Sequence, residues 1–265
     1  MSAALGFAAR LRNEPTGIAA HELSRNGQMI KLLTLLVRRS DLTHAQFVQI
    51  WAGKSTALMA AADLCRRYVQ YRLHPDRVWP PGTPQLDLQL DGIEELWLEG
   101  PTEQAAEILD RLRTPAYLQH LRNHVGAMAT CAFSEQRITN MLPEDATGDR
   151  MVKRLVPLVR KEGWSHDQFI QHWVNIHAEL LKKISPAPQR YCQLYVDAEI
   201  PPPDGIAALD VHVDGFSESW FVDEEEMNAA NPTPEGRALV ADNQIYLSRS
   251  KRFFFDEVEY HVGLK

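Results

Sequence analysis

The 265-residue sequence has no long apolar run, few cysteines and no excess of basic charge. No apolar stretch approaches the roughly 20 residues that a membrane-spanning helix requires, so no membrane association is expected. The three cysteines, Cys65, Cys131 and Cys192, are odd in number and form no C-x-x-C pair, which argues against a disulfide framework and for a cytoplasmic protein. The net charge of −7 at pH 7 argues against nucleic acid as a partner, because phosphate binding requires clustered Lys and Arg.

Several catalytic signatures are absent as well. The sequence contains no P-loop, no G-x-G-x-x-G and no G-x-S-x-G, so NTPase, dinucleotide-binding and serine hydrolase interpretations lack support. His120 and His124 have the spacing of a metal-binding pair, but no third ligand is evident and no H-E-x-x-H occurs. We therefore expect no metal. The composition, 45% hydrophobic and 24% charged, is sufficient for one large domain or two small ones.

Two parts of the sequence resemble each other. Trp51 corresponds to Trp173 at an offset of 122 residues. Two further motif pairs keep an offset of 123: "RYVQ" with "RYCQ" (from Arg67 and Arg190) and "DGIEELW" with "DGFSESW" (from Asp91 and Asp214). An offset that stays almost constant over three motifs indicates an internal duplication. The expected division is an N-terminal tail, a first unit, a linker and a second unit, at residues 1–28, 29–140, 141–150 and 151–265.

Each unit is expected to follow the order βαββαβ. An apolar run typical of a strand precedes a helix, and Thr43 or Ser165 stands where it can cap that helix. Two alternating segments predict the next strands, and a helical stretch and a last strand close each unit. A four-stranded sheet with helices on one face leaves its other face bare. Two such sheets can close face to face, which predicts a barrel-like pseudo-dimer within one chain.

The ordered motifs resemble those of the EthD domain family in the dimeric α+β barrel superfamily. The pattern is a hydrophobic strand, then (S/T)-x-x-x-F-x-x-x-W-x-x-x-H, R-Y-x-Q and D-G-x-x-E-x-W. The second unit carries all of it, at Ser165, Phe169, Trp173, His177, Arg190-Tyr191, Gln193, Asp214-Gly215, Glu218 and Trp220. The first unit has Ser55 in place of the histidine, and Ala178-Glu179 follows His177 where family members often have Gly-Pro. The resemblance implies an α+β fold of tandem ferredoxin-like βαββαβ units forming an intramolecular dimeric α+β barrel.

The resemblance also implies a range of functions. Similar domains act as lyases without a cofactor on aromatic or polyketide compounds, and others are accessory proteins of degradation pathways. A lyase acting on a hydrophobic aromatic or polyketide-like small molecule is the leading hypothesis, with decarboxylation before dehydration and no cofactor. A non-catalytic binding or accessory protein is the alternative, and an oxygenase, cofactor-free or haem-dependent, is a third. A homodimer of this chain is left open.

His177 is the leading candidate for general acid/base catalysis. It follows Trp173 by four residues, so both side chains share the helix face that points at the sheet. Histidine titrates near neutral pH, which suits proton transfer. A core histidine with both nitrogens satisfied is the alternative interpretation. Because Ser55 replaces the histidine in the first unit, we expect one active pocket, in the second unit, with the first unit retained as scaffold.

Glu218 is the second catalytic candidate. Strand alternation places it on the same face as Asp214 and Trp220, and a carboxylate on an apolar face requires a partner. We expect Glu218 to shape the pocket or orient His177. A structural role is the alternative, because the first unit repeats the motif with Glu95.

Five side chains are expected to bind the substrate. Tyr191 and Tyr195 share one face of the strand next to Glu218 and could line the same cavity as Trp173 and Trp220. Arg154 lies on the first strand of the second unit and could pair with a substrate carboxylate, which arginine binds through two hydrogen bonds.

Overall fold

The structure is a computed structural model that describes residues 29–60, 65–73, 86–141, 151–230 and 232–260. The expected tail at 1–28 and all but the first residue of the expected linker lie outside these residues. The strands and helices follow one another along the chain as β1 (Met29–Arg38), α1 (His44–Ala60), β2 (Cys65–Leu73), β3 (Gly92–Glu99), η1 (Thr102–Gln104), α2 (Ala105–Leu112), α3 (Pro115–His124), β4 (Val125–Asn140), β5 (Val152–Arg160), α4 (His166–His172), η2 (Trp173–His177), α5 (Ala178–Leu181), β6 (Arg190–Ile200), β7 (Ala207–Ala208), β8 (Gly215–Phe221), α6 (Glu224–Ala229), α7 (Pro234–Tyr246), β9 (Leu247–Ser250) and β10 (Phe253–Tyr260).

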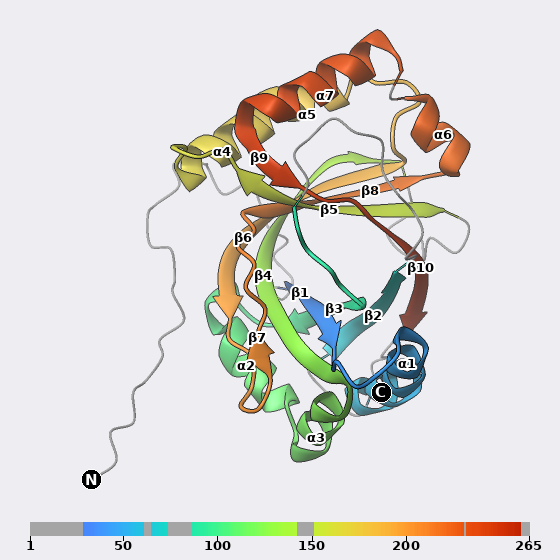
Figure 1. Ribbon diagram of the computed structural model, residues 1–265. Coiled ribbons are helices and arrows are strands. Elements are labelled where there is room, and N and C mark those ends of the chain that lie inside the picture. Colours follow the sequence, from blue (N-terminus) through green and yellow to red (C-terminus); the bar gives the residue numbers. More distant parts are fainter. Residues whose placement is uncertain (1–28, 61–64, 74–85, 142–150, 231, 261–265) are drawn as a thin grey trace.

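The strands close into a barrel. In the first half the antiparallel order is β4-β1-β3-β2, and in the second half it is β9-β5-β8-β6. Strand β10 then pairs with β2 and β5, while β4 pairs with β6, so each half is joined to the other along two edges. Helices α1–α3 lie on one side of the strands and α4–α7 on the opposite side (Figure 1). The predicted α+β barrel within one chain is confirmed.

A tryptophan holds the first helix of each half against its sheet. A Cβ added at Gly215 would lie only 2.6 Å from the Trp173 ring, which is too close for any side chain. A Cβ added at Gly92 would lie equally close to the Trp51 ring. Any larger residue would push the helix off the sheet, which gives a physical reason for the D-G in both repeats. Ser165 caps its helix through reciprocal bonds with Gln168, as expected.

The interior of the barrel contains a buried cluster of charges among apolar side chains. Lys31 Nζ lies 2.6 Å from Glu218 Oε2 and 3.4 Å from Glu95 Oε2. Lys153 pairs with the same two carboxylates, and these four side chains are at most 3% exposed. Glu135 adds a contact of 3.3 Å to Lys31. Each lysine therefore bridges a glutamate of its own half and one of the other half, and this four-charge cluster joins the two sheets.

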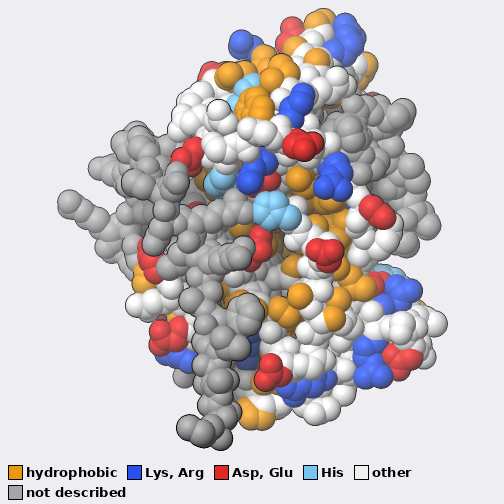
Figure 2. Space-filling view, turned by 60° about the vertical axis from the view of Figure 1, so that its left-hand side comes forward, with side chains coloured by type: hydrophobic (Ala, Val, Ile, Leu, Met, Phe, Trp, Pro, Cys, Tyr) orange, Lys and Arg blue, Asp and Glu red, His pale blue; other side chains and the backbone are white. Residues whose placement is uncertain are grey.

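The surface in Figure 2 carries charges of both signs. Figure 2 shows Lys and Arg side chains interspersed with Asp and Glu on one face, and on that face no patch of basic side chains stands out. Within the described part of the chain, no helix has the length and apolar character needed to cross a membrane.

The four-charge cluster gives the first testable prediction. Replacing Glu218 by Gln leaves Lys31 and Lys153 with one buried carboxylate fewer, and breaking a buried ion pair typically costs about 3–5 kcal/mol. We expect a loss of that order in the free energy of unfolding, measured by urea denaturation.

The matched control is Glu99→Gln, because Glu99 pairs with Arg66 at the surface with its side chain 49% exposed. That variant should unfold almost as the unchanged protein does. A Glu218→Gln protein as stable as the Glu99→Gln protein would show that the cluster does not join the halves.

Candidate functional site

Strand alternation divides the second half into two faces with different chemistry. On β8, Gly215 faces the helix through its contact with Trp173, so Ser217 and Ser219 face the helices as well. The residues between them, Phe216 and Glu218, face the barrel interior. In β3, Gly92 contacts Trp51, so the same alternation makes Glu94 face the helices and Glu95 face the barrel interior.

Two expected site residues therefore lie on the opposite face of the sheet from the pocket. Glu218 points into the barrel, where it pairs with Lys31 and Lys153, and it is on the opposite face of the sheet from His177. It does not orient His177. Trp220 also faces inward, with Lys153 Nζ 4.2 Å from the centre of its ring. The expectation failed because alternation shows which residues share a face but not which face the helices cover.

The helix that carries His177 contains a π-helical turn. Residues Trp173–His177 form η2 between α4 and α5, and both end residues of η2 are buried. A π-turn accommodates an extra residue in a helix and often occurs at a functional site. The offset between the two repeats rises from 122 at Trp173 to 123 at Arg190, so the second half has one additional residue across this region.

His177 is held by a carboxylate from another helix. Its Nδ1 lies 2.8 Å from Asp242 Oδ2 on α7, and His172 Nε2 lies 2.9 Å from the other oxygen of the same carboxylate. Since an ionised carboxylate only accepts hydrogen bonds, the His177 Nδ1–H donates to Asp242. Nε2 is then the ring nitrogen that can take or give a proton.

The surroundings keep His177 neutral at rest. Burial lowers the pKa of His177 below its ordinary value of 6.5, and the hydrogen bond and charge of Asp242 offset only part of that decrease. The charges of His172 and Arg154 lower it further. Burial alone would raise the pKa of Asp242, but the hydrogen bonds from His177 and His172 hold it below its ordinary value. The pair is thus a neutral imidazole oriented by an ionised carboxylate, which is the state required of a general base.

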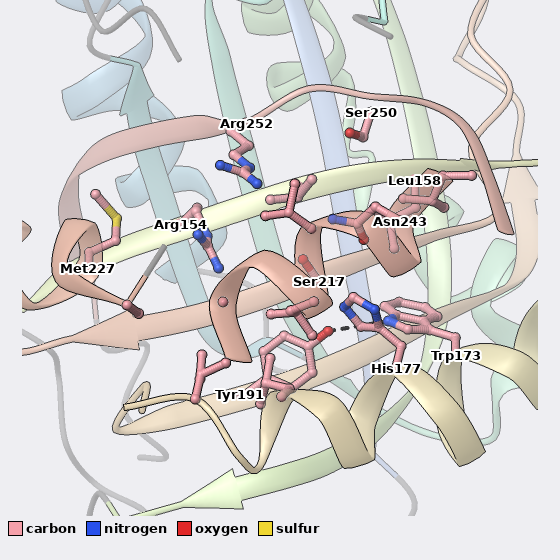
Figure 3. Close-up of a pocket in the computed structure, with 18 of the residues that line it drawn as sticks. Arg154, Leu158, Trp173, His177, Tyr191, Ser217, Met227, Asn243, Ser250 and Arg252 are labelled. Carbon is pink, nitrogen blue, oxygen red and sulfur yellow. Dashed lines mark hydrogen bonds between the residues drawn. The ribbon is translucent and has the colours of Figure 1, made fainter. Parts of the chain in front are cut away.

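A cavity lies between this helix, α7 and the outer face of the sheet (Figure 3). Its volume is about 60 Å³, and its lining includes Arg154, Trp173, His177, Tyr191, Ser217 and Arg252. Figure 3 shows the two arginine side chains at one end of the cavity and the rings of Trp173 and His177 at the other. A space of about 60 Å³ holds a few water molecules or a carboxylate, while a single benzene ring occupies a cavity of roughly 150 Å³.

The tyrosines of β6 have different surroundings. Tyr191 lines the cavity, and its hydroxyl accepts a hydrogen bond of 3.2 Å from Trp173 Nε1. Tyr195 lies on the same face but outside the cavity lining. It packs edge-on against Trp173, and its hydroxyl donates to Gln193 Oε1 over 2.7 Å. Of the expected site residues, the cavity brings together Arg154, Trp173, His177 and Tyr191.

Sequence reasoning missed two residues of the site, Asp242 and Arg252. The offset of 123 at Asp214 could not have located Asp242. The strand registers that follow α3 and α7 give an offset of 122, and this aligns Asp242 with His120. In the first half His120 Nε2 lies 2.8 Å from Ser55 Oγ, so each half joins the same two positions with a different pair of side chains.

The cavity beside His177 does not fit a haem. A volume of about 60 Å³ is below the roughly 150 Å³ that admits one benzene ring, and a porphyrin is several times larger. Since Asp242 already binds Nδ1 of His177, only Nε2 could ligate the iron. The cavity next to His177 has no room for the porphyrin. The residues beside His177 therefore do not favour a haem-dependent reaction.

Part of the second half matches a known family. Residues 161–250 match the family model of the EthD domain, which is 90 of the 265 residues. An EthD family protein from Bacillus halodurans is 23% identical, with a TM-score of 0.33 over 41% of this chain and 99% of its own. The residues that match the family model lie within the second half, so the expected EthD origin of the first half stays a prediction. No curated protein matches this sequence.

Two solved structures extend over both halves. An anthrone oxidase-like protein is 9% identical, with a TM-score of 0.61 over 91% of this chain and 96% of its own. A candidate monooxygenase from Fusobacterium nucleatum subsp. nucleatum is 6% identical, with a TM-score of 0.50 over 89% of this chain and 94% of its own. At these identities the likeness concerns the fold alone, a mixed α+β barrel.

The His177–Asp242 pair predicts a titration that can be measured. Nitrogen-15 NMR of the imidazole should show a pKa below 6.5 for His177, and Asp242→Asn should lower it further by removing the charge that raises it. Because the pKa in the folded state is lowered, the stability linked to His177 is present above pH 6.5 and is lost as the pH falls through the folded-state value.

Tyr246→Phe is the control. Tyr246 packs on the His177 ring with centroids 5.2 Å apart and carries no charge at neutral pH, so its hydroxyl should hardly affect the titration. A His177 pKa above 6.5 would show that the Asp242 charge outweighs burial.

Proposed function

We propose that this protein is a lyase that uses the His177–Asp242 pair for proton transfer on a small molecule, without a cofactor taking part. The observation that carries the proposal is an imidazole at the wall of a cavity with its Nδ1 bound by Asp242 at 2.8 Å, which makes Nε2 the nitrogen for proton transfer with the substrate. A carboxylate that fixes the imidazole tautomer in this way increases its effectiveness as a base. The EthD match over 161–250 includes this histidine.

Dehydration suits this arrangement better than decarboxylation. In a dehydration, Nε2 of His177 removes a proton from carbon, the C–O bond breaks, and the same proton leaves with the hydroxide as water. The histidine returns to its neutral state. In a decarboxylation, the C–C bond to CO₂ breaks and the new carbanion must gain a proton. A neutral His177 could supply that proton only after first taking one from water or from a substrate hydroxyl, which dehydration does not require.

The cavity also limits the substrate. The expected aromatic or polyketide-like compound would not fit in about 60 Å³ without movement of the lining side chains. Met227 lines the cavity, and methionine is the side chain that adapts most readily to a new shape. A small reacting group held in the cavity, with the rest of the molecule displacing Met227, is compatible with the present volume. Both halves belong to one chain, so the site requires no second copy.

The test is loss of turnover without loss of fold. His177→Ala should lower kcat by about 10²–10⁴-fold, the usual contribution of a general acid or base. Turnover is found by screening hydroxylated and carboxylated aromatic and aliphatic acids, with water loss followed by mass spectrometry and CO₂ by gas detection. Circular dichroism and the melting temperature report the fold.

Ser55→Ala is the matched control, because Ser55 occupies the position of His177 in the half that we regard as scaffold. It removes a hydrogen bond to His120 and should lower stability while leaving kcat nearly unchanged. A well-folded His177→Ala protein with unaltered kcat would refute the catalytic assignment. Specific binding in the screen with no turnover at all would favour the binding or accessory protein instead.

A further inference from the structure

The helix-facing side of the first half contains a buried carboxylate of its own. Glu94, 1% exposed, accepts hydrogen bonds from Trp51 Nε1 at 2.6 Å, from Tyr117 Oη at 3.2 Å and from the Tyr68 hydroxyl. Burial raises the pKa of Glu94, and the three donors lower it in part. The first half thus shows how a tryptophan and two tyrosines enclose a carboxylate under the helix.

The second half keeps two of the three donors, since Leu239 stands at the position of Tyr117, and it lacks the carboxylate. Trp51 corresponds to Trp173 and Tyr68 to Tyr191, by the offsets of 122 and 123. Glu94 corresponds to Ser217, since 94 + 123 = 217, and the strand register agrees. Gln70 lies opposite Glu94 between β2 and β3, and Gln193 lies opposite Ser217 between β6 and β8. The cavity is found beside Ser217, where the Glu94 side chain would extend.

Local contacts confirm that these positions are equivalent. Gln70 Nε2 donates to the Trp51 carbonyl oxygen over 3.2 Å, and Gln193 Nε2 donates to the Trp173 carbonyl oxygen over 2.9 Å. Without a carboxylate between them, Trp173 Nε1 donates to the Tyr191 hydroxyl instead, over 3.2 Å. The two groups are therefore hydrogen-bonded to each other in the second half, whereas their counterparts in the first half both donate to Glu94.

Two arginines make the cavity positive. Arg154 stands where the first half has Leu32, and Arg252 stands where it has Thr130, both by the offset of 122. The Arg154 side chain is oriented by a 3.1 Å hydrogen bond from its Nε to Ser219 Oγ. No aspartate or glutamate is among the described residues that line the cavity.

The energetics of these arginines favour an anion. Burial lowers the pKa of Arg154 to about 10, and burial together with the charge of Arg154 lowers the pKa of Arg252. Burial thus destabilises the charged form of each guanidinium. A carboxylate bound between the two would stabilise the charged forms. Arginine binds this planar group through two parallel hydrogen bonds.

We infer that the substrate is a carboxylic acid whose carboxylate occupies the place in the second half that the Glu94 carboxylate occupies in the first. Trp173 Nε1 and the Tyr191 hydroxyl donate to it, and Arg154 and Arg252 supply the charge. The inference rests on the proposed function for what His177 then does. A carboxylate stabilised in this way is retained rather than lost as CO₂, so the class of reaction is elimination of water from a hydroxy acid.

The first experiment places the carboxylate on the protein itself. Ser217→Glu should build the Glu94 arrangement in the second half, and Ser217→Gln is its neutral control of equal size. At pH 7 we expect the Glu variant to melt at a higher temperature than the Gln variant. The order should reverse when Arg154→Met is added to both, because a carboxylate buried away from its positive partners is destabilising. A Glu variant that melts below the Gln variant with Arg154 in place would overturn the inference.

The second experiment uses free ligands that fit the present volume. Acetate, with chloride matching its ionic strength, should raise the melting temperature, and the neutral acetamide should not. Arg154→Met should weaken acetate binding about tenfold or more, as loss of a hydrogen bond to a charged group does. Ser217→Glu should abolish the effect. Equal effects of acetate and acetamide would overturn the inference, and so would a larger effect of inorganic phosphate, which would indicate a phosphate site.

The His177→Ala variant separates this inference from the proposed function. It should still bind acetate, because His177 is not one of the donors. If it binds acetate and retains full turnover, the proton-transfer function is wrong and the carboxylate site remains. If it loses turnover while the intact protein fails to distinguish acetate from acetamide, the carboxylate site is wrong and the function remains.

Discussion

The four-charge cluster in the barrel interior is the constraint from which the rest of the structure follows. Lys31 and Lys153 are each within reach of Glu95 and Glu218, so the cluster exists only when the two sheets close on each other. Buried charges of this kind are tolerated only when paired, so the pairing favours the register that brings the four side chains together. Because Glu95 and Glu218 must point inward, the residues next to them along each strand, Glu94 and Ser217 among them, must face the helices.

The two halves are alike inside the barrel and differ beneath the helices. The inner lysines and glutamates occur in both. On the outer face, the first half has the Glu94 carboxylate and the Ser55–His120 hydrogen bond, and the second half has Arg154, Arg252 and the His177–Asp242 pair. Closing the barrel requires both sheets, but a single pocket suffices for chemistry. One half could therefore fill its pocket with its own side chain while the other kept the pocket for a ligand.

Much of this could be predicted from the sequence, and the exceptions have physical reasons. The repeated motifs predicted the barrel, and helical spacing placed His177 and Trp173 on one face. Glu218 was misplaced because alternation defines two faces without saying which one the helix covers. The glycine of each D-G motif marks the face that the helix covers, because the helix tryptophan packs directly against this residue without a Cβ. Asp242 lies 65 positions after His177, and only the fold brings them together.

The central claim is that the second half has a carboxylate site where the first half has a carboxylate. A crystal structure of the protein grown with 4-iodobenzoate tests it most directly, because the anomalous signal of iodine locates the ligand without ambiguity. The account predicts the ligand carboxylate within hydrogen-bonding distance of Tyr191 Oη and the Arg154 guanidinium, with the ring displacing Met227, and no ligand beside Glu94. A carboxylate bound elsewhere, or equal occupancy under both helices, would contradict it.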